Sequence, residues 1–152
     1  MSRIIFILGI VILISGCAGP RYSGASIPSE VLAQNPEILS IDDHETRDAF
    51  QDAVEQWLTT NGYTYIVKPE YSKHDPEKIV IEYEGYWAWD LTMYLRHAEI
   101  EAFYKGQSLS KIIYKIPNGL NLNKFGDAEE RIGLMLDILF GKITAQEATE
   151  KL

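Results

Sequence analysis

A regular alternation of side chains between residues 79 and 89 constrains the fold of this chain more than any other feature. The odd positions carry Ile79, Ile81, Tyr83, Gly85, Trp87 and Trp89, whereas the even positions include two glutamates. Successive side chains of a strand point to opposite faces of its sheet, so this pattern predicts a strand with one buried and one solvated face. The chain must therefore build a sheet that other elements cover on one side.

Two segments with helical spacing are suited to cover that sheet. Residues 49–58 carry apolar side chains at intervals of three and four, and the Asn-Gly pair at 61–62 is a typical helix end. Asp42 and Glu45 stand three apart before this segment, which predicts a carboxylate variant of the capping box. A second helix is predicted over residues 127–140.

Four further strands are predicted at residues 38–41, 63–68, 98–102 and 112–116. The last two should form a hairpin. A two-residue loop at 105–106 would place buried and exposed residues on one face, so we predict a three-residue loop that sets Glu99 opposite Lys111 and Ala98 opposite Ile112. The apolar positions are odd before residue 96 and even after residue 97, which predicts a β-bulge at Arg96-His97.

The order of these elements predicts an α/β (α+β) fold, a two-layer sandwich. A mixed sheet of four to five strands would carry both long helices on one face, with the first two strands joined by a crossover. Thr144 and Glu147 predict a capping box for a short terminal helix.

The N-terminal residues have the anatomy of a signal peptide. A short cationic head at residues 1–3 precedes an unbroken apolar run at residues 4–14. A helix needs about 20 residues to cross hydrocarbon, so this run is too short for a permanent transmembrane anchor. We expect residues 1–16 to be a lipoprotein signal peptide that is removed from the mature protein.

The sequence Ile14-Ser15-Gly16-Cys17 resembles a bacterial lipobox, and Cys17 is the only cysteine of the chain. The resemblance implies that the processing machinery diacylates the Cys17 thiol, cuts before it and acylates the new amino group. One acyl chain binds a membrane only reversibly, whereas three would hold the protein permanently. Ala18 follows Cys17 in place of Asp, which by resemblance to enterobacterial sorting implies transfer to the outer membrane, facing the periplasm. The alternative is an ordinary secretory signal whose cysteine falls here by chance.

Residues 17–36 are rich in Gly and Pro and show no sustained apolar period, so they are expected to form a lipidated tether. Residues 37–152 would then form a single domain. The 152-residue chain has a net charge of -8, so it lacks the basic surface that binding to nucleic acid requires.

The sequence carries no motif for a metal, a cofactor or nucleophilic catalysis. Its three histidines lie 30 and 23 residues apart, without the spacing of a zinc site, and a single cysteine builds neither a redox pair nor a Cys-rich zinc site. An enzymatic alternative has Asp90 orient His97 as a general base. The structural interpretation, which we favour, places Trp87 and Trp89 in the core, Asp90 at a strand end and His97 at the bulge.

The centre of the chain carries the motif Trp89-Asp90-x-x-x-Tyr94-Leu95-x-His97-Ala98-Glu99, and further on Gly119-Leu120-x-Leu122-x-Lys124. With the lipobox, these motifs resemble a family of small uncharacterised proteobacterial lipoproteins. The similarity covers roughly residues 37–140. It implies a fold and a place in the cell envelope, but no activity.

These features predict a non-enzymatic, lipid-anchored envelope protein whose partners are membrane lipid, the lipoprotein sorting machinery and another envelope protein. A sheet face that mixes apolar side chains with glutamates suits a protein interface. The candidate interaction residues on that face are Tyr86, Phe103, Leu109 and Ile113. The alternative is a small-ligand or lipid carrier with an aromatic-rich cleft between sheet and helices, containing Trp57, Trp87 and Trp89.

Overall fold

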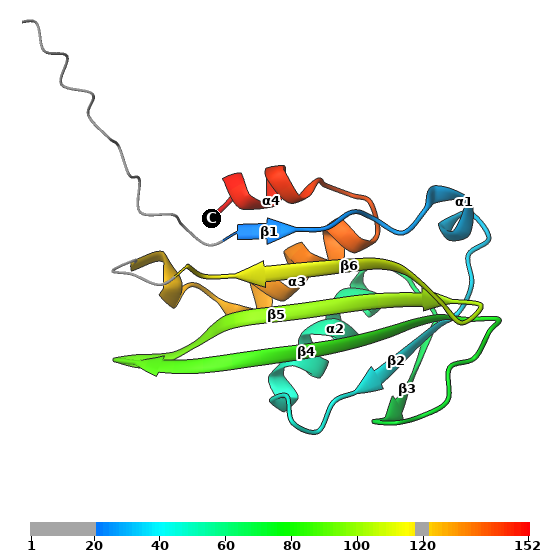
Figure 1. Cartoon of the computed structure of the whole chain (residues 1–152), viewed down its shortest axis with the longest axis horizontal. Coiled ribbons are helices and arrows are strands. Elements are labelled where there is room, and N and C mark those ends of the chain that lie inside the picture. Colours follow the sequence, from blue (N-terminus) through cyan, green and yellow to red (C-terminus); the bar gives the residue numbers. More distant parts are fainter. Residues whose placement is uncertain (1–20, 118–121) are drawn as a thin grey trace, which may run out of the picture.

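The computed structural model describes residues 21–117 and 122–152, which form an α+β fold with one mixed sheet (Figure 1). The strands are β1 (Arg21–Ser23), β2 (Ile38–Asp42), β3 (Tyr65–Pro69), β4 (Ile79–Asp90), β5 (Thr92–Tyr104) and β6 (Gln107–Lys115). The helices are α1 (Ser29–Leu32), α2 (Asp48–Thr60), α3 (Ala128–Leu139) and α4 (Ala145–Glu150), with a 3-10 turn η1 (Leu122–Phe125). None of these described helices is long and apolar enough to span a membrane.

The strand order is β1-β6-β5-β4-β2-β3. Strands β3, β2 and β4 pair in parallel, and β4, β5, β6 and β1 pair antiparallel. The prediction of a mixed sheet is thus confirmed, and its strands in the described residues number six rather than four to five. The helices α2 and α3 lie together on one side of the sheet (Figure 1), and their buried side chains share one core with β4, β5 and β6.

The additional strand comes from residues 21–36, which the sequence assigned to a tether. In the structure β1 pairs with β6, and the side chains of Tyr22 and Ile27 are only 6% and 1% exposed. Gly24, with φ of +124°, lets the backbone approach Lys111 and Ile112 where a Cβ atom would collide. The prediction failed because scattered apolar residues without a period can still be buried when an open sheet edge is available.

The two long helices were predicted correctly, but only one of their starts was. Asp127 is the N-cap of α3 and accepts a hydrogen bond from the Glu129 amide, and the predicted capping box of Thr144 and Glu147 opens α4. The capping box predicted before α2 is wrong, because that helix begins at Asp48 without a side-chain cap.

The hairpin of β5 and β6 has the predicted faces but a different register. Its loop has two residues, Lys105 and Gly106, both with positive φ, as in the turn that suits twisted strands. A bulge at Leu109 then restores the facing of buried residues, so Ile100 lies opposite Ile112. The prediction of a longer loop is wrong because it assumed that β6 has no bulge.

The hairpin of β4 and β5 is the longest pairing in the sheet. A register shift falls between the pairs Tyr86–His97 and Trp87–Leu95, which makes Arg96 the extra residue and confirms the predicted bulge. Asp90 pairs directly with Thr92, so the reversal has one residue, Leu91, whose φ is +64°. This hairpin extends beyond the other strands at the left of Figure 1.

Candidate functional site

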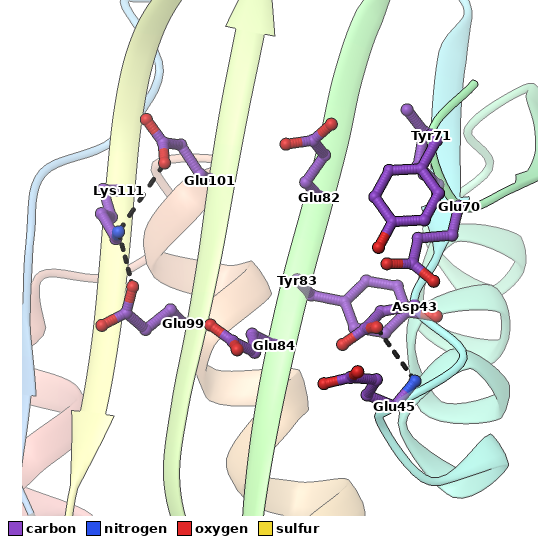
Figure 2. A pocket seen from close by; sticks show the side chains of 11 residues that line it. Asp43, Glu45, Glu70, Tyr71, Glu82, Tyr83, Glu84, Glu99, Glu101 and Lys111 are labelled. Atoms are coloured by element: carbon purple, nitrogen blue, oxygen red, sulfur yellow. Dashed lines mark hydrogen bonds and ion pairs between the residues drawn. The ribbon is translucent and has the colours of Figure 1, made fainter. Parts of the chain in front are cut away.

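The face of the sheet opposite the helices carries an acidic groove. Its floor is β4, β5 and β6, and its wall is formed by the β2–α2 connection and the residues after β3 (Figure 2). The volume of the groove is about 410 Å³. Seven carboxylates line it, together with a single lysine, Lys111; these acidic residues are Asp43, Glu45, Glu70, Glu82, Glu84, Glu99 and Glu101.

Four of these carboxylates lie directly across from one another on β4 and β5. The register pairs Glu82 with Glu101 and Glu84 with Glu99. Like charges in opposed positions of neighbouring strands destabilise a sheet. The fold therefore maintains this arrangement at some expense of stability.

Lys111 on β6 partly compensates this charge. Its ammonium lies 2.5 Å from Glu99 Oε2 and 3.7 Å from Glu101 Oε2. The hydrogen bond to Lys111, supported by one to His97, lowers the pKa of Glu99, and the same contact raises the pKa of Lys111. The carboxylates near β2 and β3 lie on the opposite side of the groove from this ion pair (Figure 2).

The wall of the groove is held by a turn that ties β2 to β4. The Asp43 carboxylate accepts hydrogen bonds from the Glu45 amide and the Thr46 hydroxyl, and the Thr46 hydroxyl oxygen accepts one from the Gly85 amide. Asp43 therefore stabilises a turn over residues 43–46, and its side chain does not cap α2. In the same wall, Tyr71 is 91% exposed, and its hydrogen bond to Glu70 raises the pKa of Tyr71.

Two histidines flank the groove and contact its glutamates. His74 Nε2 lies 2.8 Å from Glu82 Oε1, and His97 Nε2 lies 3.1 Å from Glu99 Oε1. Neither contact brings the histidine to Asp90, whose carboxylate is instead paired with the Lys124 ammonium. The geometry thus does not assemble the pair of Asp90 and His97 that the enzymatic alternative requires. Within the described ranges, no group of three or more potential ligands could hold a metal ion.

The four predicted interaction residues have different surroundings. Tyr86 is 47% exposed beside the groove. Its hydroxyl donates a hydrogen bond to the Glu84 carboxylate, which raises the pKa of Tyr86 to about 12. Phe103 is half-buried against a small apolar cluster and the ring of His74, 4.8 Å away. Ile113 is half-buried opposite Glu99. Leu109 packs against the main core instead, because the bulge turns it off the open face, so its assignment to this surface is wrong.

The motif that starts at Trp89 describes the end of the β4–β5 hairpin. Leu95 and Ala98 are fully buried, as a strand face requires. Tyr94 contacts Phe125 edge to face, and Lys124 bonds to Asp90, so the structure joins this motif to the later one. Gly119 and Leu120 of that later motif lie outside the described residues, as does Cys17.

The prediction that Trp89 lies in the core is wrong, since this side chain is 72% exposed. Helix α2 begins near Trp87, where Arg47 lies over the indole ring, and β4 continues past the cover that the helix provides. Trp57 lies near the other end of α2, where its ring stacks on Tyr63 and makes a tilted contact with Phe140. The three tryptophans therefore do not line a common cleft between sheet and helices.

The wall residues of the groove were missed in the sequence. The glutamates of β4 and β5 follow from strand alternation, but Glu45, Glu70 and Tyr71 lie in connections. The parallel pairing of β2 with β3 and β4 brings these connections to the same side. The predicted crossover between the first two strands is the one sequence signal for this proximity, but a crossover does not determine the conformation of the connecting loops.

Comparisons with known proteins add little to this geometry. No family model matches the chain, and no curated protein matches it. Among solved structures, a PDZ domain protein from Parabacteroides distasonis is similar with a TM-score of 0.41 and 12% sequence identity. The match covers 78% of this chain but only 36% of that chain.

Proposed function

We propose that this chain is a non-enzymatic, lipid-anchored protein of the bacterial cell envelope that binds a basic segment of another envelope protein in its acidic groove. The anchor is Cys17, and the expected location is the periplasmic face of the outer membrane. The lipobox resemblance supports the anchor, and the groove supports the binding role.

The observation that carries the binding role is the excess of carboxylates on an open sheet face. Seven line the groove against one lysine, and four of them stand in directly opposed pairs. A fold gains nothing in stability from opposed glutamates, whereas a bound cationic segment relieves their repulsion. Complementary charge of this kind also raises the rate of association and fixes the orientation of a partner.

The exposed aromatic ring beside the groove fits the same role. Tyr86 presents a large amphipathic side chain next to Glu84, and its ring lies tilted against that of His97 at a centroid distance of 5.4 Å. Tyrosine is enriched at protein interfaces because it combines apolar area with a polar end. A basic peptide lying across β4 and β5 would contact both kinds of side chain.

In-cell photocrosslinking tests this proposal. A photoreactive amino acid at position 86 should give a reproducible crosslink to one envelope protein, and Glu84→Lys in the same chain should abolish it. The matched control is Asp52→Lys, the same charge change at an exposed position of α2, which should leave the crosslink intact. Absence of a crosslink, or equal loss with both substitutions, would contradict the binding role.

A further inference from the structure

The end of the β4–β5 hairpin is an exposed apolar tip. Leu91 at the reversal is 84% exposed, Trp89 is 72% exposed and Met93 is 44% exposed. Trp89 and Met93 are directly paired across the two strands, so their side chains project on the same side. We call these three residues the hairpin tip.

The strand pairing places the start of the described chain at the same end of the sheet as this tip. Strand β1 is antiparallel to β6, which is antiparallel to β5, so β1 and β5 run in the same direction. Arg21 lies in one row with Lys115, His97 and Tyr86. Because β5 runs away from the tip, β1 starts toward the end of the sheet from which the tip projects (Figure 1).

The two spans from this row have similar lengths. Asp90 lies four residue steps along β4 from Tyr86, which at the rise of a strand is about 13 Å. Cys17 likewise lies four residue steps before Arg21 in the sequence, and four steps can span at most about 14 Å. A lipid group on Cys17 would therefore hold the membrane surface at a distance from this row similar to the length by which the hairpin tip extends.

The chemistry of the tip suits the boundary between headgroups and acyl chains. Tryptophan prefers this boundary because its ring is apolar and its N–H is polar, and leucine and methionine are apolar. The carboxylate at the tip, Asp90, is paired with the Lys124 ammonium, so it does not present an uncompensated charge.

We propose that the hairpin tip inserts into the same membrane leaflet that holds the lipidated Cys17. This inference rests on the proposed lipid anchoring. With two contacts, the anchor and the tip, the sheet stands on the membrane in one orientation instead of turning freely about the lipid. The acidic groove, which lies farther along β4 and β5, is thereby presented away from the membrane at a fixed height.

A fluorescent probe at either end of β5 tests this proposal. In the lipidated protein the Cys17 thiol is blocked, so Leu91→Cys and the matched control Lys105→Cys each provide one free thiol for an environment-sensitive dye. Both residues are exposed, both have positive φ in a tight turn, and they lie at opposite ends of a 13-residue strand. Met93→Cys is a second position at the tip. The labelled proteins are reconstituted in vesicles of phosphatidylethanolamine and phosphatidylglycerol with and without bromine on the acyl chains.

The expected result is loss of fluorescence of the dye at 91 and 93 with brominated lipid, and no loss at 105. If the protein floats with the vesicles but bromine quenches none of the dyes, the anchor stands and the tip proposal is overturned. A blue-shifted emission at 91 without bromine quenching also overturns it, because the tip is then covered by protein. If the protein does not float, lipid anchoring fails and the tip proposal fails with it.

Discussion

Truncating Tyr22 should destabilise the whole fold, although the sequence places this residue in a tether. Its side chain is buried, its ring lies 5.1 Å from that of Tyr114, and its hydroxyl donates to the Arg131 carbonyl at 3.2 Å. Its amide also donates to the Thr149 hydroxyl of α4. Tyr22 thus links the first strand to β6, α3 and α4.

The size of the effect follows from these contacts. Removing a buried aromatic ring costs about 3–5 kcal/mol of unfolding free energy. A typical hydrogen bond such as that of the Tyr22 hydroxyl contributes roughly 0.5–1.5 kcal/mol. Tyr22→Ala should therefore lower the stability by about 3–5 kcal/mol, a large part of the roughly 5–15 kcal/mol typical of a domain. Tyr22→Phe, which keeps the ring, should lose only about 1 kcal/mol.

Urea unfolding followed by circular dichroism measures these differences. Arg21→Ala is the matched control, because the side chain of Arg21 is exposed on the same strand, and it should change the stability by less than about 0.5 kcal/mol. If Tyr22→Ala unfolds at the same urea concentration as Arg21→Ala, the packing of β1 on the sheet is refuted and residues 21–36 are a tether after all.

Two further outcomes are expected from the same unfolding assay. Gly85→Ala should destabilise by about 1–3 kcal/mol because its Cβ would lie 2.9 Å from a ring atom of Phe50, whereas Gly133→Ala, inside α3 with its nearest contact at 3.8 Å, should stabilise by roughly 0.5–1 kcal/mol. Equal effects of the two substitutions would contradict the packing described. Lys111→Met should raise the pKa of Glu99, which the lysine lowers in the wild type. The stability that this pair adds is present above the ordinary pKa of a glutamate and is lost as pH falls through the lowered pKa, so wild type and variant should converge in acid. A difference independent of pH would refute this.

Much of the fold could be predicted because its signals are local. The alternation from Ile79 onward, the helical spacing before Asn61 and the capping box of Thr144 each depend on residues near one another in the chain. The bulge at Arg96 was also predictable, since the apolar positions of one strand change phase only where an extra residue is inserted.

The errors concern features that depend on tertiary contacts. A three-residue loop without a bulge and a two-residue loop with a bulge at Leu109 place the same residues of β6 on the buried face. The apolar pattern therefore does not distinguish the two registers. Trp89 occupies a position that the alternation assigns to the core, but α2 begins near Trp87 and does not extend over Trp89. The residues around Tyr22 show no apolar period, and Tyr22 is buried because β1 pairs with the edge of β6.

The candidate site was predicted in part for the same reason. The glutamates of the open face follow from strand alternation, and so does Tyr86. The wall of the groove does not, because Asp43 and Glu70 meet those glutamates only through the parallel pairing of β2 with its neighbours.

The mass of the mature polypeptide, extracted from the membranes of a bacterial host, tests the proposed lipid anchor most directly. We expect a chain that begins at Cys17 and carries the added mass of a diacylglyceryl group and one further acyl chain. A mature chain with an unmodified Cys17 thiol, or one that retains residues 1–16, would contradict lipid anchoring and the proposals that depend on it.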